Sequence, residues 1–323
     1  MRALKVSRLY PKNTILSATA IFHHRDRMSR GGERMALERV LKFYRQQSPL
    51  TDPKEYARLY RGLPRDIPSL VKVVQNVLTH AGWLGAYGLE LPEERYQEEM
   101  YLRPVQAMLA KIQDLQAGPL TAPRAPERGL VSLCRDFGVM LVSMLRHQGV
   151  PARLRVGFAG YFNPRSRYWD HRIAEFWDGS RWVLVDPQLD EVQRNILNLE
   201  FNPLDMRPDA PFYLAGEAWQ LCRAGCIDPD TFADSPTDVG LPMVRYALLH
   251  DLDALNKVEL VGPDAWHELI SKPEEKLNDA DFIVLGRIAE LTVHADECFD
   301  EMRAFYAELP YAQAVRERLE AIA

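Results

Sequence analysis

The stretch from residue 129 to about residue 190 constrains the fold most, because its pattern of apolar residues changes from a helical period to a strand period. Ser132 is expected to cap a helix whose apolar positions continue at helical spacing as far as Leu145. Gly149 suits the position just after a helix, and Pro151 follows two residues later. The sequence therefore predicts one helix whose start and end are both marked.

Strand patterns follow this helix. Residues 153–162 alternate and are rich in Val, Phe and Tyr. Two further strands are expected at about 170–177 and 181–185, joined by Asp178-Gly179-Ser180, and Asp-Gly is a strong hairpin signal. The order of helix, strand and hairpin predicts an α+β core in which one helix packs on an antiparallel sheet.

One cysteine, one histidine and one aspartate fall at informative points of this core. Cys134 lies in the first turn of the helix, where the helix dipole and free N–H groups favour a thiolate. His171 begins one hairpin strand and Asp186 ends the other, so the pairing of the strands brings them together. The pattern predicts a nucleophile, a general base that then acts as an acid, and an orienting carboxylate.

Each of these three residues also has an ordinary structural interpretation. A cysteine flanked by apolar residues is commonly part of the core, and an Asp before Pro is commonly a turn former. A histidine on a strand is commonly a hydrogen-bonded structural residue. Their joint occurrence at one helix start and two strand ends is what favours a Cys-His-Asp site. The backbone N–H of Cys134 and of its helix neighbours would then supply part of an oxyanion hole.

The composition is that of a globular chain and argues against several classes of protein. Of the 323 residues, 47% are hydrophobic and 26% are charged, which argues against a disordered chain. The 40 basic and 45 acidic residues give a net charge of −5 with no long basic run, so we expect no nucleic-acid partner. No apolar run reaches the ~18 residues of a membrane-spanning helix, and we expect no membrane contact. The start lacks the features of a signal peptide and is interpreted as mature protein.

The cysteines and histidines indicate neither a disulfide scaffold nor a metal site. The four cysteines are Cys134, Cys222, Cys226 and Cys298. They are too few for disulfide bonds to stabilise a chain of this length. No nearby pair of Cys or His completes a zinc site with Cys222 and Cys226. His23 and His24 have no thiol partner at ligand spacing and are expected at the surface. We therefore expect no metal, no cofactor and a reducing, cytoplasmic location.

Composition and periodicity divide the chain into regions. Residues 1–118 are expected to be mostly helical, and 119–128 to form a Pro-rich loop. The predicted core spans 129–190. Residues 191–323 are helical again and are expected to pack on the core, because each flank alone would leave long apolar faces unburied.

Two helical stretches stand out in the last region. One is expected over residues 242–260, and the stretch 281–319 is expected to hold two helices broken near Glu297. The charged segment 250–259 is interpreted as a solvated helix face, with a lid over the site as the alternative.

The segments LCRDFGVMLVSMLRHQGVPARLRVGFAGYF and DHRIAEFWDGSRWVLVDPQ resemble the core of the transglutaminase-like superfamily. That family is similar to papain-like cysteine proteases and peptide N-glycanases in its catalytic skeleton. Its pattern is a Cys that opens a helix ending in a Gly-hydrophobic-Pro-Ala turn, followed by strands that carry His and Asp. The matching positions here are Cys134, the turn 149–152, His171 and Asp186. The separations, 171 − 134 = 37 and 186 − 171 = 15, are those that the family leads us to expect.

The resemblance implies carbonyl chemistry through a thioester on Cys134. Water as the second substrate would make the protein an amidase, peptidase or glycanase, and an amine would make it a transglutaminase or amide synthase. The substrate would be a peptide, a protein or a small amide. Hydrolysis is slightly favoured because water is always present. A non-catalytic protein-binding module is the alternative, and the complete set of three residues argues against it.

The sequence offers several candidates for the side chain that completes the oxyanion hole. Six residues upstream of the cysteine, where papain-like enzymes carry Gln, this chain has Arg128, which is interpreted as a solvated loop residue. Gln188 and the rings of Trp169 and Tyr168 are the candidates. Alternatively, Gln188 is part of a turn, and the two aromatic rings pack on the strand.

Three charged residues are candidates for supporting the site. Arg135 and Asp136 follow the nucleophile on the helix, one expected to face solvent and the other to brace the strands. Asp170 precedes His171, so a regular strand would point it to the opposite face of the sheet, in a structural role.

Overall fold

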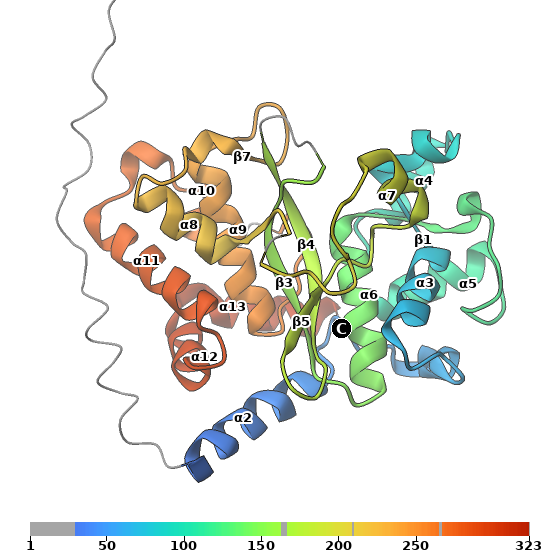
Figure 1. Ribbon diagram of the computed structural model, residues 1–323, viewed down its shortest axis with the longest axis horizontal. Coiled ribbons are helices and arrows are strands. Elements are labelled where there is room, and N and C mark those ends of the chain that lie inside the picture. The colour runs from blue at the N-terminus through green and yellow to red at the C-terminus, as the bar shows by residue number, and fades with distance from the viewer. Residues whose placement is uncertain (1–29, 163–166, 209, 265–266, 323) are drawn as a thin grey trace, which may run out of the picture. The chain divides into compact units, whose positions relative to one another are not determined.

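We describe the fold from a computed structural model, which covers these residues: 30–162, 167–208, 210–264 and 267–322. His23 and His24 lie outside the described residues. The chain divides into two compact units, residues 1–40 and 41–323. Helix α2 (Arg30–Arg45) begins in the first unit, and every other element described below belongs to the second (Figure 1).

In the described part of the chain, five strands form a curved central sheet in the order β5-β4-β3-β6, with β7 paired to β4. Their bounds are β3 (Ala152–Ala159), β4 (Tyr168–Trp177), β5 (Trp182–Val185), β6 (Phe212–Leu214) and β7 (Phe232–Ala233). All pairs are antiparallel except β4 with β7. The β4–β5 hairpin turns at Gly179, whose φ of +108° suits glycine. The Asp178 carboxylate accepts the Ser180 and Arg181 N–H groups and so closes the turn.

Helices precede and follow this sheet. Within the described residues the α-helices of the second unit are α3 (Ile67–Val77), α4 (Glu93–Glu99), α5 (Val105–Leu115), α6 (Cys134–His147), α7 (Glu191–Leu197), α8 (Ala215–Arg223), α9 (Leu241–Leu255), α10 (Glu268–Ser271), α11 (Asp279–Val293), α12 (Phe299–Glu308) and α13 (Pro310–Ile322). None of the helices described is long and apolar enough to cross a membrane.

Helix α6 packs on one face of the sheet, and α9 covers the other (Figure 1). Successive residues of a strand point to opposite faces. Accordingly, Leu154 of β3 lies against α6, whereas the neighbouring Arg155 pairs with Asp251 of α9 at 2.9 Å. Gly138 lets α6 approach closely, because a Cβ there would lie only 2.5 Å from Leu154 Cδ1. The sheet and these two helices form the core that supports the site.

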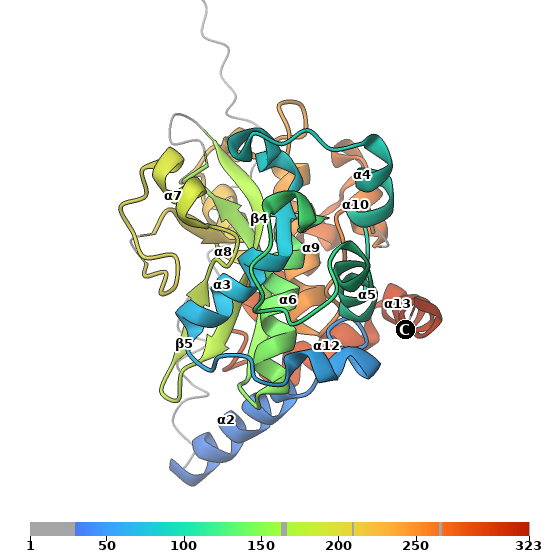
Figure 2. The ribbon, with the colours of Figure 1, turned by 90° about the vertical axis from the view of Figure 1, so that its right-hand side faces the viewer.

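A second, two-stranded sheet lies at the start of α6. Strands β1 (Leu78–His80) and β2 (Leu130–Ser132) run parallel, with His80 paired to Ser132. Gly129 lets the two segments meet, because a Cβ at this position would lie 2.2 Å from Thr79 Oγ1. This ladder carries His80 to the helix start although it lies far upstream in sequence. Helix α3, which leads into β1, packs on α6 (Figure 2).

The fold class predicted from the sequence is confirmed. The structure is an α+β fold with the expected helix packed on an antiparallel sheet and with helical flanks. The expected helix appears as α6, and the three expected strands appear as β3, β4 and β5. Gly149 ends α6 with a φ of +81°. The proposed division into regions stays a prediction.

Several details of the expectation are wrong. Ser132 does not cap α6 but ends β2, and its hydroxyl donates to the Leu130 carbonyl at 2.9 Å. Helix α9 ends at Leu255, and its charged residues are buried rather than solvated. The stretch 281–319 holds parts of three helices, because α12 and α13 are separated by a further break at Leu309.

Candidate active site

Cys134 is the first residue of α6, and its partly exposed side chain lines a cavity. Leu133 before it has extended backbone, with φ −109° and ψ 170°. The Asp136 carboxylate accepts the Leu133 N–H at 2.9 Å, and the Asp136 N–H donates to the Leu133 carbonyl at 2.9 Å. This reciprocal cap starts the helix at the thiol. The positive end of the helix dipole therefore lies at the sulfur and favours the thiolate.

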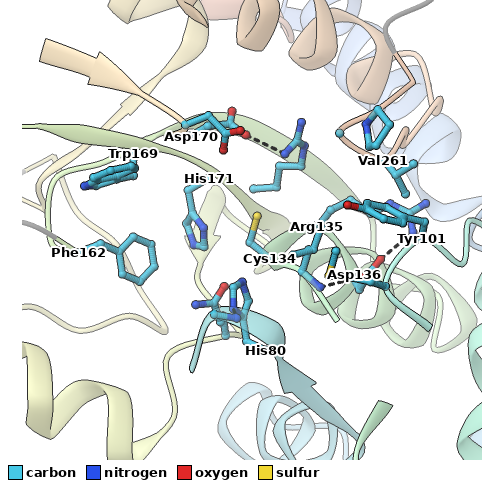
Figure 3. A pocket seen from close by; sticks show the side chains of 18 of the residues that line it. His80, Tyr101, Cys134, Arg135, Asp136, Phe162, Trp169, Asp170, His171 and Val261 are labelled. Carbon is cyan, nitrogen blue, oxygen red and sulfur yellow. Dashed lines mark hydrogen bonds and ion pairs between the residues drawn. The ribbon is translucent and has the colours of Figure 1, made fainter. Parts of the chain in front are cut away.

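His171 lies on β4 and faces the sulfur of Cys134 (Figure 3). Its side chain is only 2% exposed, and its interaction with the thiol favours the thiolate. The Nε2 atom contacts Asp186 Oδ2 at 2.8 Å. The other ring nitrogen, Nδ1, is therefore the one that faces the sulfur and can exchange a proton with it.

Asp186 follows β5 and is fully buried. Besides His171, its Oδ2 accepts the Tyr161 hydroxyl at 2.6 Å, and its Oδ1 accepts the Gln188 N–H at 3.0 Å. The Asp186 N–H donates to the Pro203 carbonyl at 2.8 Å. These contacts hold the carboxylate, and through it the orientation of the imidazole.

A second imidazole, that of His80, also interacts with the thiol of Cys134 and favours its thiolate. Figure 3 shows it on a different side of the sulfur from His171. Its Nδ1 accepts the Gly82 N–H at 3.1 Å, so the ring proton is assigned to Nε2. His80 is thus a donor toward the sulfur. Sequence reasoning missed it, because only the pairing of β1 with β2 brings residues 80 and 134 together.

The pKa values of Cys134 and His171 are shifted in opposite directions. Burial favours the neutral thiol, but hydrogen bonds from His171 and His80 and the charges of His171 and Arg172 outweigh it and lower the pKa of Cys134 to about 6. Burial also opposes the charged form of His171, but the Asp186 carboxylate and the thiolate raise its pKa to about 10. At neutral pH the pair is therefore a thiolate and an imidazolium.

The thiol opens into a cavity of about 870 Å³. The predicted site residues that line it, besides Cys134 and His171, are Arg135, Asp136, Trp169, Asp170 and Gln188. Phe162 also lines it and meets the His171 ring edge-on, with centroids 4.9 Å apart. Tyr168 is not among the lining residues and instead packs on Tyr213, with centroids 5.0 Å apart.

The charged residues that flank the nucleophile are both buried. Arg135 pairs with Asp136 at 3.0 Å and donates to the Glu259 carbonyl, so neither side chain faces solvent. Asp170 pairs with Arg172 at 2.8 Å. Although neighbours on a strand point to opposite faces, Asp170 and His171 both line the cavity, because it reaches past the end of the sheet. Arg128 is exposed, as expected of a loop residue.

A chain of hydrogen bonds fixes the orientation of the Gln188 amide. The Asp190 carboxylate can only accept, so the Tyr87 hydroxyl donates to it at 2.6 Å. Tyr87 in turn accepts from Gln193 Nε2 at 3.0 Å, which turns Gln193 Oε1 toward Gln188 Nε2 at 3.2 Å. Gln188 Oε1 is left buried and has no hydrogen-bond partner in the described structure. Gln188 thus offers the cavity an acceptor rather than a free oxyanion donor.

The described residues contain no group of three or more His, Cys, Asp or Glu side chains arranged to hold a metal ion.

A cysteine that opens a helix, packed on an antiparallel sheet that carries His and Asp, defines the class of papain- and transglutaminase-like cores. Residues 118–187 match the family model described as "Transglutaminase-like superfamily". This segment is therefore similar to a transglutaminase-like core.

One solved structure similar to this chain is described as "a Putative Cysteine Protease from Cytophaga hutchinsonii". The two share 13% sequence identity with a TM-score of 0.31, and the match covers 54% of this chain and 62% of that one. The chain thus spans less than two thirds of that structure. No curated protein matches the chain.

Proposed function

We propose that this protein is a cysteine-dependent amide hydrolase that works through a thioester on Cys134. The observation that carries the proposal is the Cys134 sulfur flanked by two imidazoles, one of which is bound to the buried Asp186, at the wall of a cavity (Figure 3). Cys134 is the nucleophile, His171 moves the proton, and Asp186 orients His171.

In the first half of the reaction the thiolate sulfur bonds to the carbonyl carbon, and the carbonyl electron pair moves to oxygen. The Cys134 N–H, unpaired in the first turn of a helix, and the His80 Nε2–H donate to that oxyanion. The imidazolium of His171 then gives its proton to the leaving nitrogen. The C–N bond breaks, an amine leaves, and a thioester remains.

In the second half, water attacks the thioester while neutral His171 takes one of its protons. The C–S bond breaks, a carboxylic acid leaves, and the thiolate–imidazolium pair is restored. An amine in place of water gives acyl transfer by the same steps. Hydrolysis is the proposal because water needs no binding site of its own.

The Gln188 carbonyl supports an amide substrate over an ester. Its Oε1 is buried at the cavity and lacks a donor within the described structure. Leaving such an acceptor unpaired in a complex is costly, so a ligand that brings an N–H group to it gains affinity. A peptide or another secondary amide carries such a group, and a simple ester does not.

The proposal is tested by the rate at which iodoacetamide alkylates Cys134 as a function of pH. Peptide mass spectrometry separates this thiol from the others, and Cys222, whose pKa is raised to about 11 by burial and by Asp228, serves as an internal standard. We expect the wild-type rate to follow a pKa near 6, against ~8.5 for an ordinary thiol. His171→Ala is expected to abolish this fast reaction.

The matched control is His294→Ala, which removes an exposed imidazole that does not line the cavity. It should leave the alkylation profile of Cys134 unchanged. A slow Cys134 that is indifferent to His171 would contradict the enzyme and favour a protein-binding module. If Cys134 reacts fast, mass spectrometry of the products formed from simple amides, with and without added amines, separates hydrolysis from acyl transfer.

A further inference from the structure

One end of the cavity carries negative charge that no described basic side chain neutralises. Arg135 and Arg172 line the cavity, but their charges are matched by Asp136 and Asp170, at 3.0 and 2.8 Å. Two more lining carboxylates remain: Asp234 and Asp238. Within the described part of the chain, neither forms an ion pair. Both are exposed on the loop that follows β7, where a ligand in the cavity can reach them.

Asp170 adds a second and independent observation at this end. Its side chain is 4% exposed, and Arg172 occupies only Oδ2. The other oxygen, Oδ1, is buried without a hydrogen-bond partner in the described structure. Figure 3 shows Asp170 at the cavity wall above His171. A carboxylate oxygen left without a donor costs free energy, and a ligand that supplies an N–H donor removes that cost.

The electrostatics of Asp234 agree with this arrangement. Partial desolvation and the charges of Asp170, Cys134 and Asp238, opposed by Arg172, raise the pKa of Asp234 to about 6. The carboxylate is thus ionised at neutral pH in a field that is already negative. A bound cation would relieve this repulsion.

We infer that the cavity binds substrates that carry an ammonium or guanidinium group, placed between Asp234 and Asp170. Met243 and the ring of Tyr246 line the same region and suit the alkyl stem of such a group. A peptide with a lysine or arginine side chain near the scissile amide has this chemistry, and so does a small amide with a basic tail. The inference rests on the proposed function, in which Cys134 attacks a carbonyl group of the substrate. It adds the class of substrate that carries this carbonyl.

Charged methanethiosulfonates test the inference through Cys134 itself. The thiolate attacks the reagent sulfur, a disulfide forms, and methanesulfinate leaves. The 2-(trimethylammonio)ethyl, 2-hydroxyethyl and 2-sulfonatoethyl reagents deliver a positive, a neutral and a negative group through the same step. The rate of each at pH 7.5 is measured by peptide mass spectrometry on the full chain, and the cation-to-neutral ratio is compared between variants.

We expect the double variant Asp234→Asn/Asp238→Asn to lower the cation-to-neutral ratio by about three- to tenfold, the size expected when two charges that line the same solvated cavity as the thiol are removed. The neutral reagent reports any change in the reactivity of the thiol itself, so the ratio isolates the effect of charge. Asp114→Asn/Glu275→Gln changes the net charge equally at exposed positions outside the cavity and should leave the ratio unchanged.

A second measurement needs no variant. Butylguanidinium should protect wild-type Cys134 from the neutral reagent at concentrations where butylurea, of similar shape but uncharged, does not. A fast thiol with equal ratios in all variants and no selective protection would overturn this inference and leave the proposed function standing. A thiol that is slow with every reagent would instead contradict the proposed function.

Discussion

Two imidazoles contact one sulfur, and their other ring nitrogens decide what each can do. His171 places Nε2 against the Asp186 carboxylate, which stabilises the doubly protonated ring. His80 places Nδ1 against a backbone donor, the Gly82 N–H, so a proton on Nδ1 would break that hydrogen bond. The first imidazole is suited to exchange protons. The second is suited to donate.

This difference predicts the effects of two substitutions at His80. His80→Ala removes a donor from the sulfur and from the oxyanion, so we expect kcat to fall about 10²-fold, the usual cost of one oxyanion-hole donor, and the alkylation profile of Cys134 to shift to higher pH. His80→Gln keeps an N–H donor. It should therefore retain part of the wild-type kcat and part of the fast alkylation of Cys134 at low pH. Rates and alkylation profiles of both variants provide the measurement. Equal losses in the two variants would indicate a merely structural role.

The parts of the site that could be predicted are those whose position follows from local pattern. Cys134 begins α6 and Asp186 follows β5, and the pairing of β4 with β5 relates Asp186 to His171. His80 could not be predicted in this way, because its place depends on a parallel pairing between short segments far apart in sequence. The orientation of Gln188 depends on a chain of side-chain hydrogen bonds that no sequence pattern reveals.

At the scale of elements, the contact between α6 and the sheet sets the position of the nucleophile. Gly138→Val would place side-chain atoms where Leu154 Cδ1 and the Ile173 backbone lie. We expect a loss of about 1–3 kcal/mol in the free energy of unfolding and a slower reaction of Cys134 at pH 7, because the helix that carries it must shift. Urea unfolding and alkylation rates measure the two effects.

The control for this prediction is Gly286→Ala on α11. A Cβ at Gly286 meets nothing within 4 Å, so the substitution should stabilise the protein by about 0.5–1 kcal/mol through helix propensity. A Gly138 variant that behaved like the Gly286 variant would show that α6 does not depend on the close approach.

Elements with a clear pattern were predictable, and those defined by tertiary contacts were not. The α6 helix and the hairpin have marked ends, whereas β6 and β7 span only three and two residues and owe their conformation to the sheet edges that they join. The charged residues of α9 predict a solvent-exposed helix face, and this prediction is wrong. In the structure they form buried pairs, such as Asp251 with Arg155 of β3.

The same helix carries a carboxyl group whose titration should be visible in the stability of the protein. Burial raises the pKa of Asp253 to about 7, although the Tyr311 and Tyr306 hydroxyls donate to it. Between pH 4 and 7 the native state thus holds a proton that the unfolded state has released, so stability falls as pH rises. Asp253→Asn removes this dependence.

We therefore expect the stability of Asp253→Asn, relative to wild type, to increase by about 3 kcal/mol from pH 4.5 to pH 8. Urea unfolding at several pH values measures it. A difference between the two proteins that stays constant with pH would show that Asp253 titrates normally in the native state.

At the scale of the whole molecule, the buried carboxylate of Glu259 joins distant parts of the second unit. It accepts from Arg146 of α6 at 3.0 Å and from the Ser48 hydroxyl at 2.8 Å, and its backbone carbonyl accepts from Arg135 beside the nucleophile. Both members of the Arg146–Glu259 pair have no exposed side-chain surface. A buried charge that loses its partner is strongly destabilising, whereas losing both members costs much less.

We expect Glu259→Ala to lower the free energy of unfolding by about 3–5 kcal/mol, because it leaves the Arg146 guanidinium buried and without a counter-charge. The double variant Arg146→Met/Glu259→Leu should be destabilised less than this single variant, although it is further from the natural sequence. Glu98→Ala, which breaks an exposed pair with Lys111, should change the stability far less than Glu259→Ala does. The free energies of unfolding of the three variants, measured in urea, test this prediction. If Glu259→Ala costs no more than Glu98→Ala, the regions that meet at Glu259 are held together by apolar packing alone.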